Sequence, residues 1–215
     1  MSICVDLSHE IEDGLITYPG LPAPRITDHL SREASAARYA PGVTFQIGRI
    51  EMVANTGTYL DSPFHRHADG HDLAGLPLTS LADLPALVLR PKERAVGPEL
   101  FEGRELRGKA VLVHTGWDSM WRHQRYLENA PFLTEGAVRR LVDGGAALVG
   151  IDSSNIDDVG DLARPAHSLL LGAGIPIVEH LTGLERLPEE GARFFAVPPK
   201  VKGFGTFPVR AFAIV

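Results

Sequence analysis

Residues 55–67 read Asn-Thr-Gly-Thr-Tyr-Leu-Asp-Ser-Pro-Phe-His-Arg-His, the densest group of polar side chains in the sequence. Asp61 and His65 are four residues apart, but Pro63 between them favours an extended or turning path over a helix. On that path a carboxylate oxygen and an imidazole nitrogen can still converge on one ion, and both suit zinc or manganese. Taken alone, the stretch is equally compatible with a polar surface loop of solvated histidines, the role we also expect for His67 and His71.

A second polar pair brackets an apolar stretch. Residues 164–179 read Arg-Pro-Ala-His-Ser-Leu-Leu-Leu-Gly-Ala-Gly-Ile-Pro-Ile-Val-Glu. Glu179 ends an expected buried strand, where a charged carboxylate costs free energy unless it is paired or bound to a cation. Taken in isolation, Glu179 is more commonly ion-paired with an arginine. A lone histidine such as His167 is more commonly a hydrogen-bonded core residue. Gly172 and Gly174 lack the third glycine of a dinucleotide-binding loop, and the order is helix then strand, so we reject such a site.

Together the two stretches resemble the cyclase family, whose best-known members are the bacterial kynurenine formamidases, with isatin hydrolase a relative. The family carries the pattern His-x-Gly-Thr-His-x-Asp-x-Pro-x-His, and residues 55–65 keep five of its seven fixed positions. Residues 170–179 are similar almost residue for residue, and the likeness extends to residues 6–10, 18–20, 114–117 and 150–154. It implies one domain over residues 1–215, an α/β cyclase-like swivelling β/β/α fold with a central mixed sheet or barrel-like core.

The resemblance also implies a metal site. In dinuclear members the first two motif histidines hold one metal, and the third motif histidine and the later histidine hold the other. The motif aspartate and the later glutamate bridge the two metals. Here the first two positions are Asn55 and Tyr59. An amide oxygen binds zinc weakly and a phenol must first lose its proton, so the first metal position should be empty or very weak. We therefore expect one divalent ion, zinc rather than manganese, held by Asp61, His65, His167 and Glu179.

One such ion can lower the pKa of a bound water and polarise a carbonyl. The expected function is metal-dependent hydrolysis of an amide, lactam or ester bond of a small aromatic substrate, resembling arylformamidase acting on N-formylkynurenine. The expected catalytic residues are Tyr59, Glu179 and His65, with Tyr59 donating a hydrogen bond to the oxyanion, and the expected pocket residues are Asn55, Phe64 and Trp117. A metal-assisted dehydratase or isomerase, and a non-catalytic binding homologue, stay open as alternatives.

Composition limits the partners. The formal charge of −6 arises from scattered acids and bases, which disfavours nucleic acid or a membrane surface and leaves a small-molecule substrate. The N-terminus has no basic and apolar leader pattern, so the cytoplasm is the expected compartment. The single cysteine, Cys4, lies between Ile3 and Val5 and is expected to be a buried strand residue. The family resemblance implies a homodimer or a tetramer.

Hydrophobic periodicity predicts the elements. Thr134 can cap a helix that Gly144 ends, and a shorter helix is expected at 165–171. Residues 152–158 should be a loop in which Asp152 and Ser153 bond backbone near the site, and residues 204–207 a turn without chemistry. Strands are expected at 3–7, 43–53 (with a bulge), 86–89, 110–114, 147–151, 175–178, 194–197 and 209–214.

Overall fold

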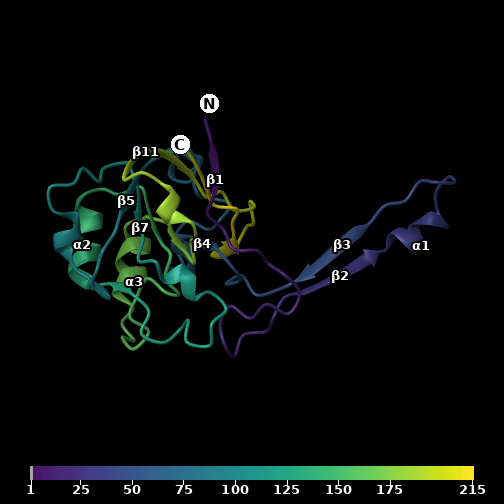
Figure 1. Cartoon of the computed structure of the whole chain (residues 1–215), viewed down its shortest axis with the longest axis horizontal. Coiled ribbons are helices and arrows are strands. Elements are labelled where there is room, and N and C mark those ends of the chain that lie inside the picture. Colours follow the sequence, from purple (N-terminus) through teal and green to yellow (C-terminus); the bar gives the residue numbers. More distant parts are fainter. Residues whose placement is uncertain (1) are drawn as a thin grey trace.

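The computed structural model describes residues 2–215, and within them the chain is organised around a nine-stranded mixed sheet in the order β1-β13-β11-β5-β7-β9-β10-β4-β12 (Figure 1). Strands β5, β7, β9 and β10 run parallel, and β4 pairs antiparallel with β10 on one side and β12 on the other. The strands are β1 (Cys4–Asp6), β4 (Tyr59–Asp61), β5 (Leu84–Leu89), β7 (Ala110–Val113), β9 (Leu148–Ile151), β10 (Ile177–Glu179), β11 (Glu190–Phe195), β12 (Thr206–Pro208) and β13 (Phe212–Ile214).

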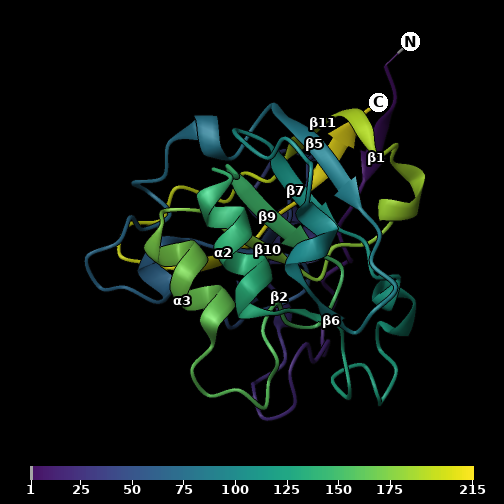
Figure 2. The same ribbon diagram turned by 90° about the vertical axis from the view of Figure 1, so that its left-hand side faces the viewer.

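Two helices cover one face of the sheet, α2 (Glu135–Asp143) and α3 (Pro165–Gly172), as Figure 2 shows. The Thr134 hydroxyl accepts a hydrogen bond from the Ala137 N–H at 3.3 Å and so caps α2, as predicted. Strand residues alternate between the two faces, so every second one packs under the helices. The helix-side core includes Leu87, Leu89, Val111, Val113, Ala137, Val138, Leu141, Ala166, Leu170 and Leu171.

The opposite face of the sheet packs against loop residues that include Leu73, Leu76, Leu81, Leu184 and Leu187. Its core contains the alternate residues of the same strands, with side chains from β4 and β11. The central strands are apolar on both faces, which is typical of parallel strands buried between two layers. Members of this second core are Val5, Leu60, Ala86, Val88, Leu112, Val178, Phe194 and Ala213.

An arm projects from the body in Figure 1. It consists of β2 (Arg25–Leu30) and β3 (Ile47–Glu51), which pair only with each other, and of α1 (Arg32–Ala36) near its tip. Several of its large apolar side chains are exposed: Ile26, Tyr39, Val43, Phe45, Ile47 and Ile50. The homo-oligomer implied by the family resemblance stays a prediction, which the mass of the particle in solution would check.

The remaining elements are short. A parallel pair joins β6 (Ala95–Val96) to β8 (Phe132–Leu133). Single turns of 3-10 helix are η1 (Pro63–His65), η2 (Leu78–Ser80), η3 (Pro98–Phe101), η4 (Trp117–Met120) and η5 (Leu184–Arg186). Across residues 2–215 no helix has the length and apolar character needed to cross a membrane.

The predicted α/β class with a mixed central sheet is confirmed, and several local predictions are wrong. The strand expected at 194–197 lies at Glu190–Phe195, and the one expected at 209–214 is limited to Phe212–Ile214. Cys4 lies in a strand, as predicted, but is exposed, because successive residues of β1 face opposite sides and its neighbour Val5 takes the core side. The strand expected at 43–53 is limited to Ile47–Glu51, and the irregular register lies in β2, between Asp28 and Leu30. The turn expected at 204–207 instead leads into β12, where Thr206 pairs with Asp61 of β4.

Candidate metal centre

The structure brings three of the four predicted ligands together. Asp61 ends β4, His65 ends η1 directly after it, and His167 lies in the first turn of α3. One ligand atom of each lies within 4.8 Å of the others. Pro63 starts η1, so of the two paths expected from this proline, extended or turning, the chain takes the turning one between Asp61 and His65. Gly205 of the neighbouring segment lies so close that a Cβ there would be 2.7 Å from the His65 backbone.

Thr206 fixes the first imidazole. Its hydroxyl donates to Asp61 Oδ1 and lies 2.8 Å from His65 Nδ1. Because that hydroxyl hydrogen is used on the carboxylate, the oxygen accepts from Nδ1–H of His65. The second ring nitrogen, Nε2, therefore keeps its lone pair, which is the form in which histidine binds a metal.

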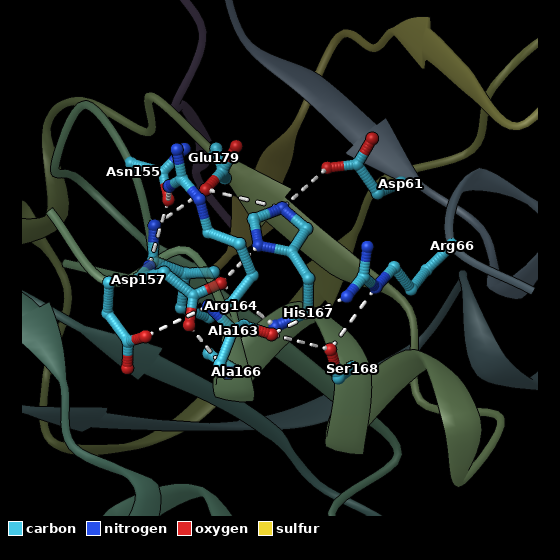
Figure 3. A network of polar contacts seen from close by, with 12 residues as sticks. Asp61, Arg66, Asn155, Asp157, Ala163, Arg164, Ala166, His167, Ser168 and Glu179 are labelled. Atoms are coloured by element: carbon cyan, nitrogen blue, oxygen red, sulfur yellow. Dashed lines mark hydrogen bonds and ion pairs between the residues drawn. The ribbon is translucent and has the colours of Figure 1, made fainter. Parts of the chain in front are cut away.

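Asp157 fixes the second imidazole (Figure 3). Its carboxylate accepts from His167 Nδ1 at 2.6 Å and from the backbone N–H groups of Ala166 at 2.6 Å and of His167 at 3.1 Å. It thus caps α3 and orients the ring at the same time. Burial lowers the pKa of His167, but the hydrogen bond to Asp157 and the nearby carboxylates outweigh burial and raise the pKa to about 10.

The arrangement fits a divalent cation. Asp61 is fully buried, and its Oδ2 has no hydrogen-bond partner among residues 2–215, which is costly for a carboxylate oxygen. That oxygen lies 3.7 Å from His167 Nε2. A tetrahedral ion with metal–ligand distances of about 2.1 Å separates its ligand atoms by about 3.4 Å, close to the observed spacing. One carboxylate and two imidazoles form a common zinc donor set.

Glu179 lies at the edge of this group. Its Oε1 is 3.9 Å from His167 Nε2 and accepts from the Ile156 N–H at 2.6 Å, while Oε2 accepts from the Tyr59 hydroxyl at 2.6 Å. A carboxylate oxygen has two lone pairs, so Oε1 retains one that can serve a cation or a proton. Burial raises the pKa of Glu179 to about 7, against the opposing charge of His167.

A buried tyrosine cluster fills the place where the family pattern has its first histidines. Tyr59 pairs directly with Glu179 across β4 and β10, and its hydroxyl lies 2.9 Å from that of Tyr18. The Tyr18 hydroxyl in turn reaches His180 Nε2 at 2.9 Å. Burial and the charge of Glu179 raise the pKa of Tyr59 well above its usual value, so the phenol stays protonated. Its hydrogen is already donated to Glu179.

The centre opens into a cavity of about 320 Å³. Asn55 lies in its wall, where it was predicted, whereas Phe64 and Trp117 do not line it. Trp117 Nε1 instead donates to the Tyr126 carbonyl at 2.8 Å. The lining residues are Tyr18, Leu21, Asn55, Tyr59, His65, Arg66, Asn155, Arg164, His167 and Glu179.

Sequence reasoning missed several residues of this site. Asp157 lies in the run 152–158, which was assigned to a loop, and Thr206 lies in the presumed turn. Asp152 of the same run does bond backbone as predicted, accepting from the Thr115 and Gly116 N–H groups at 2.8 and 2.7 Å. His67 and His71 lie outside the cavity lining. No spacing pattern marks Asp157 or Thr206, because each meets its histidine only in the folded chain.

Several known proteins resemble this chain over nearly its whole length. The chain is 25% identical to the kynurenine formamidase of Bacillus cereus over 208 residues, 96% of this chain and 95% of that protein. Isatin hydrolase A from Labrenzia aggregata, solved with benzyl benzoate, has the same fold, with a TM-score of 0.84 at 23% identity over 100% of this chain and 94% of that one. A predicted metal-dependent hydrolase from Bacillus stearothermophilus is 26% identical, with a TM-score of 0.74 over 100% of this chain and 98% of that one. The Cyclase family model matches residues 5–158, more than half of the sequence, and the chain therefore belongs to the cyclase family.

Proposed function

We propose that this chain hydrolyses the carbon–nitrogen bond of a small arylformamide of the N-formylkynurenine type, with one divalent cation held by Asp61, His65 and His167 and approached by Glu179. The observation that carries the proposal is the buried, unpartnered Oδ2 of Asp61, which faces His167 Nε2 at 3.7 Å beside the cavity. The enzyme is a metal-dependent hydrolase, in agreement with relatives that include a kynurenine formamidase and an isatin hydrolase.

A bound divalent cation would supply an acidified water and polarisation of the substrate carbonyl. Glu179 is the base next to that position, because its Oε1 lies at the ligand group while its other oxygen is held by Tyr59. Tyr59 acts as a positioning residue for Glu179 and not as the oxyanion donor expected from sequence. In the neutral form of each ring, the hydrogen bonds to Asp157 and Thr206 hold the imidazole protons of His167 and His65 on Nδ1, which would leave Nε2 free to bind a cation.

Metal stripping and reconstitution test the proposal. The protein is treated with a chelator, reloaded separately with zinc and with manganese, and assayed with N-formylkynurenine, formanilide and isatin. We expect about one metal equivalent per chain and hydrolysis that disappears on stripping and returns on reloading. His65→Ala should abolish both metal binding and hydrolysis, whereas His71→Ala, an exposed histidine outside the cavity, should preserve both. A loaded protein that hydrolyses none of these substrates would refute the proposal.

A further inference from the structure

Two arginines belong to the wall of the metal cavity, Arg66 and Arg164. Arg66 directly follows His65 of η1, and Arg164 directly precedes Pro165 at the start of α3. Figure 3 shows them on opposite sides of His167, with Arg164 next to Asn155 and Arg66 next to Ser168. The hydrolytic chemistry described above uses neither guanidinium.

Neither guanidinium is neutralised by the protein. Among residues 2–215, no carboxylate oxygen lies within 4.0 Å of the charged nitrogens of Arg66 or Arg164. Their hydrogen bonds go to neutral acceptors: Arg66 Nε donates to Ser168 Oγ at 3.2 Å and Nη2 to the Ala163 carbonyl at 3.5 Å, and Arg164 Nη1 donates to Asn155 Oδ1 at 3.2 Å. A guanidinium has five N–H donors, so both side chains keep donors for a ligand.

The backbone at Arg164 gives an independent indication. Its φ of 49° and ψ of 60° lie in the left-handed region, which costs a non-glycine residue about 1–2 kcal/mol. Arg164 stands at the N-cap of α3, yet its side chain makes no capping hydrogen bond, and Asp157 accepts from the first free N–H groups instead. Neither the turn nor the helix therefore requires an arginine at this position. Strained residues of this kind concentrate at ligand-binding sites.

A partly buried hydrogen-bond path links Arg164 to the centre. Asn155 Oδ1 accepts from Arg164 Nη1 at 3.2 Å and from the Asp157 N–H at 2.9 Å. Asp157 is the residue that orients His167. The Arg164 guanidinium is thus tied through Asn155 to the residue that orients His167, as suits a substrate-positioning group.

We propose that Arg66 and Arg164 bind a carboxylate carried by the substrate, away from the scissile bond. This inference rests on the proposed function and narrows it to anionic arylformamides. The planar guanidinium matches a carboxylate in a bidentate geometry and holds its charge at every physiological pH. A divalent cation would balance the negative charge of the carboxylates around it. The two guanidiniums would then give the cavity wall a net positive charge, which favours an anionic ligand.

A pair of substrates that differ in one carboxylate tests the subsite. We compare kcat/KM for 2-formamidobenzoate and for formanilide in the zinc-loaded wild type, in Arg66→Gln and in Arg164→Gln. We expect the wild type to prefer the carboxylate substrate and each variant to lower that preference by about 10-fold or more. Arg107→Gln, a matched loss of charge at an exposed arginine outside the cavity, should leave the preference unchanged. If Arg164→Gln fails to fold, Arg66→Gln still decides the outcome.

A binding measurement separates this inference from the proposed function. Titration calorimetry of 2-aminobenzoate into the zinc-loaded proteins should show binding to the wild type that weakens about 10-fold in each glutamine variant. If N-formylkynurenine, 2-formamidobenzoate and formanilide all resist hydrolysis but this loss is seen, the function is refuted and the subsite stands. If both are hydrolysed, and neither the substrate preference nor the binding of 2-aminobenzoate changes in Arg66→Gln and Arg164→Gln, the subsite is refuted and the function stands.

Discussion

Asp157→Asn is the change that best tests how the chain prepares its metal ligands. The Asp157 carboxylate accepts three hydrogen bonds, two from the α3 backbone and one from His167 Nδ1 at 2.6 Å. The amide has one acceptor oxygen, so it can keep part of the α3 cap but not the charged bond to the imidazole. Loss of such an orienting partner typically weakens metal binding 10- to 100-fold, or about 1.4–2.7 kcal/mol. Folding should be affected less, because the helix keeps a capping acceptor.

Metal dissociation constants, measured by competition with a chelating dye, check this prediction. Asp158→Asn is the control, because it removes the same charge one residue away, where Asp158 lies 3.7 Å from Arg94 and does not contact His167. We expect a 10- to 100-fold weaker dissociation constant for Asp157→Asn and an unchanged one for Asp158→Asn. Equal constants in the wild type and Asp157→Asn would show that His167 is not a ligand, or that the ring needs no orienting partner.

Three further predictions follow from the same geometry. Glu179→Gln should lower kcat by at least 100-fold with metal retained, because the general base is lost; near-normal turnover in a metal-loaded variant would remove Glu179 from that role. The double change Asn55→His with Tyr59→His should restore the family's first ligand pair and so raise the metal content from about one to about two equivalents per chain. Metal analysis that finds two equivalents in the natural protein would contradict the single-ion prediction. Burial lowers the pKa of His9 from 6.5 to about 4, so as the pH falls the unfolded chain protonates this histidine before the folded chain does. The stability that neutral His9 contributes is therefore present above pH 6.5 and lost as the pH falls through 4. His9→Gln should show a smaller fall in melting temperature than the wild type between pH 7 and 4.5, and an equal fall would rule His9 out as the cause.

The candidate ligands could be named from the sequence because they lie in two short stretches that resemble the cyclase family. Asp61 and His65 lie within five residues, and His167 and Glu179 stand out as polar groups in an apolar stretch. The structure also confirms the turn at Pro63, which follows from the fixed geometry of proline. These features depend on neighbours along the chain, so they can be inferred from the sequence without knowing the fold.

The partners of the ligands could not be predicted, because they depend on strand order. Thr206 reaches Asp61 across 145 residues, and this contact exists only because β12 pairs with β4. The prediction that Phe64 and Trp117 line the cavity is wrong for the same reason. Phe64 and Trp117 lie near the motifs in sequence, but the cavity wall is completed by Tyr18, Asn155 and Arg164, whose positions follow from the tertiary fold.

The pairing of β4 also sets the order in which the protein can be completed during synthesis. β4 has two neighbours in the sheet, and both are encoded far downstream: Tyr59 meets Glu179 after 120 residues, and Asp61 meets Thr206 after 145. On the ribosome, β4 emerges early and remains an unpaired edge while most of the chain is translated. The threonine that orients His65 emerges with the last strands. Thr206 follows all four candidate ligands in the sequence, so the hydrogen bonds that orient His65 form only once β12 has paired with β4.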